Sequence, residues 1–394
     1  MADSGADSVA EKGRNLSARR AAFGRPFEFV ESEIPVPGSG EVVIRVLYCG
    51  ICGSELHILK DPRESDPPQR EHTGLPSQIL QNPYSVAASN LGFLGHEYSG
   101  VVESAGPDVS GWEKGARVVG LARLPCGSCS RCLAEDPLNC LDQWRPHDRA
   151  YAKYMLVRAA QLRRVPDGLD LRLAALATPF SECLHSLDAA EWRPGLNALV
   201  VGAGPMGLCT TVLLLHSGAV SVVVTEPNEG RRNLAASLGA VAVPPEAGLE
   251  TVAQLSTGEG VDVAFESVGS VQAFTTAMSA VRQGGRVVMI GLAPRRDVYE
   301  LELRNFWNRR ISIVVGGAPE PTIDRALNLM PHLGTERLIA GEFPLDQMNE
   351  AFASAANGWP GKVLVTPWAG QNPHESSMSE ETGFTTNHAS HSRK

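Results

Sequence analysis

The chain has 394 residues, of which 43% are hydrophobic and 20% are charged. These proportions are ordinary for a globular protein and exclude disorder as its main state, and the length allows two domains or one large one. Thirty-five Lys and Arg against 44 Asp and Glu give a formal net charge of -9, so nothing in the total favours nucleic acid as a partner.

Both ends of the chain are polar. Residues 1–18 and 370–394 contain too few apolar side chains to offset the entropy of ordering, so we expect both to be disordered tails. No apolar run reaches the roughly 18 to 20 residues of a membrane span, and no secretory segment opens the sequence. We therefore expect a cytoplasmic protein with no membrane contact.

The first part of the chain, from residue 27 to 165, is rich in short β-type runs. These runs, at 41–47, 98–102 and 116–119, are separated by Gly and Pro, as is typical of a β-rich domain. A long segment at 61–91, rich in Pro, Gln, Asn and Ser, interrupts the pattern. Connections of this length usually have a function, so we expect this loop to line a binding site.

From residue 197 the pattern changes to apolar strands that alternate with helices. Continuous apolar strands separated by helices predict a parallel sheet that is covered on both faces. We expect strands at 198–201, 220–224, 261–265, 287–290 and 311–315, and helices at 205–216, 229–238 and 271–282. The segment from 319 to 367 is expected to add one helix and a last strand at 362–365.

This order predicts an α/β protein of two domains. A β-rich catalytic domain would comprise residues 19–179 and 319–369, and a doubly wound domain at 180–318 would be inserted into it. In such an arrangement the ligand lies in the cleft at the carboxyl ends of the parallel strands.

The strongest single motif is Gly202-x-Gly204-x-x-Gly207, which follows a strand and opens a helix. Its glycines permit a tight turn, close approach of a pyrophosphate and close packing of helix on strand, while the helix N-terminus attracts phosphate. Glu226 ends the next strand, where a carboxylate binds ribose hydroxyls and repels a 2'-phosphate. We therefore predict NAD, although the nearby Arg231 and Arg232 leave NADP open.

A second motif is a loop with four cysteines: Cys126, Cys129, Cys132 and Cys140. Four thiolates complete a tetrahedral zinc shell and leave no position for water, which is typical of a structural zinc site. An iron–sulfur cluster and four free thiols are the alternatives, and the free thiols would be exposed to oxidation.

A third constellation joins Cys52 to His96 and Glu97. Each residue alone is a weak signal, since a single cysteine after a strand is more often a small buried residue. Beside a nicotinamide domain, however, a thiolate, an imidazole and a carboxylate form a candidate catalytic zinc site with an open position for a substrate oxygen.

Taken together, these motifs and their order resemble the zinc-containing medium-chain alcohol and polyol dehydrogenases over residues 25–367, and most of all the butanediol and sorbitol dehydrogenase branch. The resemblance implies a GroES-like catalytic domain with a Rossmann domain, and two zinc ions per chain. It also implies roles for single residues: Cys52 and His96 bind catalytic zinc, Glu97 is a ligand or its close partner, Glu55 orients His96, Ser54 binds the substrate hydroxyl, His57 takes its proton, Met206 backs the nicotinamide, and Glu226 and Arg231 contact the ribose.

The chain departs from this branch at Thr178, where the family usually has a zinc-binding Glu. A hydroxyl is a poor zinc ligand, so the fourth contact is open to water, Glu97 or another side chain. Glu182 lies one helical turn further on and is a candidate to compensate, although a helix residue without a metal role is the simpler interpretation.

The sequence therefore predicts a zinc-dependent oxidoreductase that interconverts a secondary alcohol, of the diol or polyol type, and a ketone with NAD(H). One alternative is an NAD(P)H-dependent reductase of a larger carbonyl or iminium substrate, and another is a non-catalytic nucleotide-binding protein. An edge strand at 311–315 would allow pairing across a two-fold axis, so a homodimer or homotetramer is expected.

Overall fold

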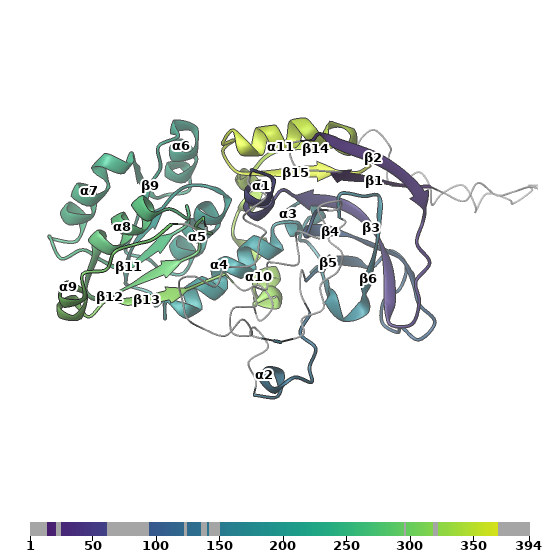
Figure 1. The fold of residues 1–394 in the computed structure, drawn as a ribbon, viewed down its shortest axis with the longest axis horizontal. Coiled ribbons are helices and arrows are strands. Elements are labelled where there is room, and N and C mark those ends of the chain that lie inside the picture. Colours follow the sequence, from purple (N-terminus) through teal and green to yellow (C-terminus); the bar gives the residue numbers. More distant parts are fainter. Residues whose placement is uncertain are drawn as a thin grey trace, which may run out of the picture.

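The computed structural model describes residues 14–20, 25–60, 94–121, 124–134, 140–141, 150–294, 297–317 and 322–368. Two large sheets lie next to each other along the long axis, one β-rich and one surrounded by helices (Figure 1). The predicted α/β class is confirmed. The expected loop at 61–91 and the expected tail at 370–394 lie outside the described residues.

An N-terminal hairpin consists of strands β1 (Arg14–Arg20) and β2 (Phe27–Glu33), which pair antiparallel. The Asn15 side chain exchanges hydrogen bonds of 3.1 and 3.0 Å with the backbone of Tyr154, and the Ala18 N–H donates to the Tyr151 carbonyl. The expectation of a tail is therefore wrong for residues 14–18. Backbone pairing orders this segment although it offers little apolar surface.

The β-rich domain that the sequence predicts to be catalytic is built on a seven-stranded sheet around β3 (Glu41–Gly50), a strand buried on both faces. Antiparallel pairing with β4 (Glu97–Ala105) sets Gly50 opposite Glu97, so the end of β3 meets the start of β4. The strand order is β14-β15-β3-β4-β5-β7, and β6 also pairs with β3. The remaining strands are β5 (Arg117–Gly120), β6 (Tyr154–Arg158), β7 (Leu162–Arg164), β14 (Ile339–Pro344) and β15 (Lys362–Thr366).

The second sheet has six parallel strands in the order β10-β9-β8-β11-β12-β13, which is the arrangement of a dinucleotide-binding fold. The order reverses direction beside β8, and this fold binds its ligand at the carboxyl ends of the strands at such a switch point. The strands are β8 (Asn197–Val201), β9 (Ser221–Thr225), β10 (Val241–Val243), β11 (Val261–Glu266), β12 (Val281–Met289) and β13 (Ser312–Val315).

Helices cover both faces of this sheet. Side chains along each strand point alternately to one face and the other, and each face has its own hydrophobic core. Ala198 and Val200 pack with helices α4 (Ala177–Ala189) and α5 (Pro205–His216), whereas Leu199 and Val201 pack with α7 and α8. The other helices here are α6 (Glu229–Ser237), α7 (Gly248–Leu255), α8 (Val271–Ala280) and α9 (Leu303–Arg309).

The C-terminal segment returns to the catalytic domain and holds more structure than the single helix and strand expected at 319–367. Helix α10 (Ile323–Leu329) packs on α4, and α11 (Met348–Ala356) connects β14 to β15. The two strands are parallel, and a parallel pair needs a crossover, which α11 supplies. Strand β15 then pairs with β3 and completes the catalytic sheet.

Three short α-helices of the described chain are still to be named: α1 (Gly53–Lys60), α2 (Ser130–Leu133) and α3 (Leu171–Ala174). Helix α1 follows β3, and α4 runs through the expected domain boundary at 179/180. Among the described helices, none is both long enough and apolar enough to cross a lipid bilayer.

Candidate active site and metal centres

Cys52 lies in the short connection between β3 and α1. The Ile51 N–H donates to the Val363 carbonyl on β15, which fixes the connection, and the Ser54 Oγ donates to the Cys52 Sγ at 3.1 Å. Cys49, three residues earlier, is fully buried, and burial raises the pKa of its thiol well above the usual value. Of these two cysteines, only Cys52 is therefore placed to serve as a thiolate ligand.

His96 lies directly before strand β4 and Glu97 is the first residue of that strand, beside this connection. Gly95 precedes them at a φ of 102°, and an added Cβ there would lie 2.8 Å from the Tyr151 backbone nitrogen. Only glycine fits a position with that φ and so close a neighbour. Because β3 and β4 are paired, the turn before β4 carries His96 to the same end of the sheet as Cys52.

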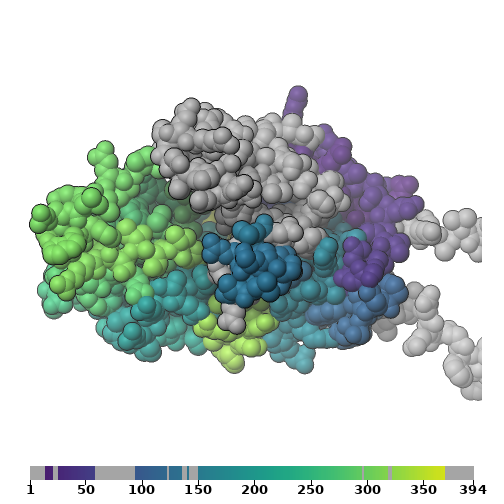
Figure 2. Space-filling model, turned by 60° about the horizontal axis from the view of Figure 1, so that its bottom comes forward, coloured from purple at the N-terminus to yellow at the C-terminus, as the bar shows by residue number. Residues whose placement is uncertain are grey.

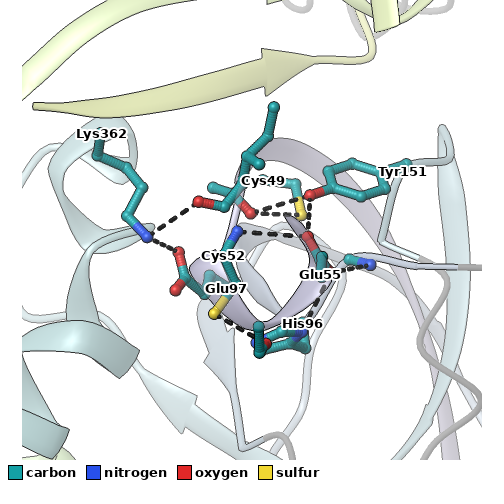
Figure 3. Close-up of polar contacts among 11 residues, drawn as sticks. Cys49, Cys52, Glu55, His96, Glu97, Tyr151 and Lys362 are labelled. Carbon is teal, nitrogen blue, oxygen red and sulfur yellow. Dashed lines mark hydrogen bonds and ion pairs between the residues drawn. The ribbon is translucent and has the colours of Figure 1, made fainter. Parts of the chain in front are cut away.

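The structure thus brings together the three side chains that the sequence proposed as metal ligands. One donor atom each of Cys52, His96 and Glu97 lies within 4.8 Å of the others (Figure 3). A thiolate, an imidazole and a carboxylate suit zinc, and three protein ligands leave a fourth position open, as in catalytic sites. The donor set therefore fits a zinc ion.

Glu55 holds His96 from behind. The His96 Nδ1 lies 3.2 Å from the Glu55 Oε1, which also accepts the Gly95 N–H at 2.8 Å. The Glu55 Oε2 accepts the Tyr151 hydroxyl at 2.6 Å and the Cys52 N–H at 3.3 Å. With Nδ1 engaged in this way, the other ring nitrogen of His96 is left for a metal, as a ligating imidazole requires.

The charges in this network depend on one another. Burial raises the pKa of the Glu55 carboxyl, but hydrogen bonds and charge from His96, with those from Tyr151 and Gly95, outweigh it and keep the pKa below its usual value. Burial lowers the pKa of His96, yet the Cys52 thiolate and Glu55 raise it by more, to well above the usual value. A metal that binds here must therefore displace a proton.

Lys362 is a member of the site that the sequence analysis missed. Its Nζ lies 2.6 Å from the Glu97 Oε2 and donates to the Ile51 carbonyl at 3.1 Å, and both charged side chains are 3% exposed (Figure 3). Burial lowers the pKa of Lys362, but the Glu97 charge raises it by more, so the ammonium stays charged. Glu97 is thus shared between the metal position and a buried cation, which is consistent with either of its expected roles.

Thr178 and Glu182 lie on α4. Thr178 is 6% exposed near the start of the helix, and its hydroxyl replaces the carboxylate that the family pattern would supply. Glu182 is not part of the described cluster of metal-ligating side chains, so the structure does not bring it to the three donors. Ser54 and His57 share one face of α1, three residues apart, and both are half-buried.

The glycine motif forms the turn between β8 and α5. Gly202 has a φ of 96°, and an added Cβ would lie 2.6 Å from the Val268 side chain. A Cβ on Gly207 would overlap the Gly202 carbonyl oxygen, whereas a Cβ on Gly204 would meet nothing within 4 Å. Gly202 and Gly207 therefore serve packing, and Gly204 faces open space where a ligand can approach. Met206, half-buried, follows Gly204 at the start of α5.

Glu226, Arg231 and Arg232 lie near the end of β9. The Glu226 carboxylate accepts the N–H groups of Ala203 and Asn228 at 2.8 and 2.9 Å, so it ties the glycine turn to the next strand. A carboxylate has about four acceptor positions, which leaves capacity for ribose hydroxyls. The Arg231 Nε donates to the Trp359 carbonyl at 3.4 Å. The Arg232 guanidinium donates to the carbonyls of Glu226 and Pro227, so it wraps the turn.

The four-cysteine loop forms a separate site around α2, at the outer edge of the molecule in Figure 1 and on the surface in Figure 2. The Sγ atoms of Cys126 and Cys132 are 4.0 Å apart, and those of Cys129 and Cys140 are 3.9 Å apart. A zinc ion with Zn–S bonds of about 2.3 Å places tetrahedral sulfurs about 3.8 Å apart. The loop therefore fits zinc.

Backbone amides tune these thiols. N–H groups of Cys132 and Leu141 lower the pKa of Cys129 to about 6, whereas partial burial raises the pKa of Cys132 to about 12. A zinc ion that binds here must therefore displace the proton of Cys132, so metal binding releases protons.

Comparisons with known proteins agree with this geometry. The family model "Alcohol dehydrogenase GroES-like domain" matches residues 38–167, and "Zinc-binding dehydrogenase" matches residues 205–331. L-threonine 3-dehydrogenase of Streptomyces coelicolor is 30% identical over 361 residues, which are 85% of this chain and 94% of the relative.

Solved structures share the fold. A protein of Sinorhizobium meliloti, described as a zinc-binding dehydrogenase and solved with NADP, has 27% identity and a TM-score of 0.77 over 90% of this chain and 100% of its own. 2R,3R-butanediol dehydrogenase of Bacillus subtilis has 24% identity and a TM-score of 0.74 over 90% of this chain and 99% of its own. The chain belongs to the zinc-containing medium-chain alcohol dehydrogenase family.

Proposed function

We propose that this enzyme interconverts a secondary alcohol and a ketone with NAD(H), and that the substrate is of the diol or polyol type. The observation that carries the proposal is the convergence of Cys52, His96 and Glu97 within 4.8 Å of one another. The relatives named L-threonine 3-dehydrogenase support a secondary alcohol with a polar neighbouring group, since the L-threonine hydroxyl is of this kind.

Cys52, His96 and Glu97 would hold the catalytic zinc, which when bound supplies Lewis acidity that lowers the pKa of an alcohol. Side chains of the protein then bind the substrate hydroxyl and accept its proton. The Ser54 Oγ, beside the Cys52 Sγ, hydrogen-bonds the substrate hydroxyl. His57, three residues further along α1, accepts the proton.

The Rossmann domain binds the dinucleotide. Gly204 leaves room for the pyrophosphate at the N-terminus of α5, whose N–H groups and dipole favour phosphate. Glu226 accepts the adenosine ribose hydroxyls and disfavours a 2'-phosphate, while Met206 and Arg231 contact the nicotinamide and the ribose. The second zinc, held by Cys126, Cys129, Cys132 and Cys140, is structural.

The edge strand β13 supports assembly into a homodimer or homotetramer. Val315 on β13 and Trp307 on the preceding helix α9 are 73% and 74% exposed. An uncovered edge with apolar side chains next to it favours pairing with a second copy across a two-fold axis. Val315→Lys would then shift the mass measured by light scattering towards the monomer, and an unchanged mass would contradict this mode of assembly.

The function is tested with Cys52→Ala and, as a matched control, Cys49→Ala. A panel of vicinal diols, polyols, L-threonine and simple secondary alcohols is scored by reduction of NAD and NADP, with zinc counted on the same samples. We expect two zinc ions per chain in the wild type and in Cys49→Ala, and one zinc with no turnover in Cys52→Ala, which still binds NADH. Turnover at the wild-type rate in Cys52→Ala would remove zinc from the mechanism.

A further inference from the structure

We propose that Tyr151 is a positioning residue for the catalytic metal: its hydroxyl locks the Glu55 carboxylate, and Glu55 in turn holds His96 in the orientation needed for metal binding. The inference rests on the proposed metal site at Cys52, His96 and Glu97. Tyr151 lies just before β6, far from these residues in the sequence, and its hydroxyl reaches the Glu55 Oε2 at 2.6 Å (Figure 3).

The donors around Glu55 explain why this one hydroxyl matters. Each carboxylate oxygen receives two donors: Oε1 from the Gly95 N–H and the His96 Nδ1, and Oε2 from the Tyr151 hydroxyl and the Cys52 N–H. Glu55 therefore touches both Cys52 and His96, so its orientation sets the position of two proposed metal ligands at once.

The bond from Tyr151 is the shortest contact of the four. A hydroxyl that donates to a carboxylate at 2.6 Å is charge-assisted and roughly twice as strong as a neutral hydrogen bond. The competing donor on the same oxygen, the Cys52 N–H, lies at 3.3 Å. Without the hydroxyl, this long contact is the one that Oε2 keeps from the described residues, and rotation of the carboxylate would loosen the contact of Oε1 with the His96 Nδ1.

Tyr151 is itself firmly held. The residue is 1% exposed, its ring packs edge-on against Phe352 at 5.7 Å, and its carbonyl accepts the Ala18 N–H. Its hydroxyl also lies 3.2 Å from the Gly50 carbonyl at the end of β3. Glu55 is 2% exposed, so bulk water does not readily replace the lost donor. The Tyr151 side chain is therefore held in one position between the N-terminal hairpin and the proposed metal site.

The experiment compares Tyr151→Phe with Tyr98→Phe in the purified, zinc-loaded full chain. Both changes remove a buried phenolic hydroxyl from the catalytic domain, but Tyr98, 3% exposed, packs its hydroxyl against Gly120 instead of Glu55. The rate at which a chromogenic chelator removes zinc is measured. Cys52→Ala, which is expected to hold only the zinc of the four-cysteine loop, shows which slow phase of release belongs to that loop. A second readout is the visible spectrum after cobalt replaces zinc, since thiolate–cobalt bands report ligand geometry.

We expect Tyr151→Phe to lose the catalytic-site zinc about 10-fold faster than wild type, the lower end of the effect of residues that support metal ligands. Tyr98→Phe should match the wild type, and the cobalt spectrum should change only in Tyr151→Phe. In a Glu55→Gln background, adding Tyr151→Phe should cause little further loss, because both changes act through the same carboxylate.

Two results would overturn the inference. The first is a zinc release rate and a cobalt spectrum in Tyr151→Phe that equal those of the wild type. The second is an acceleration of zinc release by Tyr151→Phe that is as large in the Glu55→Gln background as in the wild type. Failure of the proposed function gives a different pattern. In that case wild type and Cys52→Ala hold the same number of zinc ions, so that no release phase is assigned to the catalytic site.

Discussion

The two glycines that flank the start of α5 should respond to the same substitution in opposite ways. Gly204 has a φ of -68°, which any residue adopts, and an added Cβ meets nothing within 4 Å. Gly204→Ala should therefore lower the free energy of unfolding by at most about 1 kcal/mol, the scale of a changed N-cap. The new methyl group, however, would occupy the space through which a pyrophosphate approaches the N–H groups of the helix.

Gly207→Ala presents the reverse case. Its Cβ would overlap the Gly202 carbonyl oxygen, so α5 must move away from β8, and overpacking of this kind costs about 1–3 kcal/mol. We expect Gly204→Ala to weaken NADH binding at least about tenfold, or about 1.4 kcal/mol, with near-normal stability. Gly207→Ala should lose stability first and binding as a consequence.

The assay pairs urea unfolding of the cofactor-free protein with fluorescence titration of NADH. The reasoning is refuted if Gly204→Ala binds NADH as tightly as the wild type, because the phosphates would then not lie against this position. It is equally refuted if the two variants are destabilised to the same extent.

Two further predictions concern buried charges. Lys362→Met leaves the Glu97 carboxylate buried without its cation and should lower the free energy of unfolding of the chelator-treated protein by about 3–5 kcal/mol. Adding Glu97→Gln to this variant should recover part of the lost stability. If urea unfolding shows no recovery, the two side chains do not stabilise the protein as a pair. Glu266→Gln keeps the acceptor for the Val268 and Gly269 N–H groups, both of which bind one oxygen. Burial raises the pKa of Glu266, so wild-type stability falls as pH rises from about 4.5 through the native pKa. The melting temperature of Glu266→Gln minus that of the wild type should therefore grow as the pH rises above about 4.5, and a constant difference would contradict the shift.

Local spacing was enough to predict the parts of the molecule in which near neighbours make the site. The four cysteines lie within 15 residues, and their sulfurs meet as tetrahedral ligands should. The glycine turn is set by its own strand and helix. The apolar strands after residue 197 identified the Rossmann sheet because each is buried on both faces.

The sequence said less where distant segments decide the structure. Lys362 begins an apolar strand, and nothing in the pattern indicates that its side chain faces Glu97, because that depends on the pairing of β15 with β3. The sequence around Tyr151 indicates only a buried aromatic residue, because its contact with Glu55 likewise depends on how distant segments pack. Strand β14 was missed because Gly341 and Glu342 break the apolar run, and its pairing depends on the crossover through α11.

The place of β15 in the catalytic sheet has a consequence for biosynthesis. Of the strands in the described residues this one is made last, yet it lies between β14 and β3, and Lys362 contacts a carbonyl 311 residues earlier in the chain. At about 5–20 residues per second, a ribosome needs about 15–60 s to bridge that separation. During this interval β3 has an open edge and Glu97 has no ammonium partner, while the inserted nucleotide-binding unit emerges complete. Nascent chains should thus acquire a folded Rossmann unit before the zinc pocket closes, and the synthesis of β15 governs when the enzyme matures.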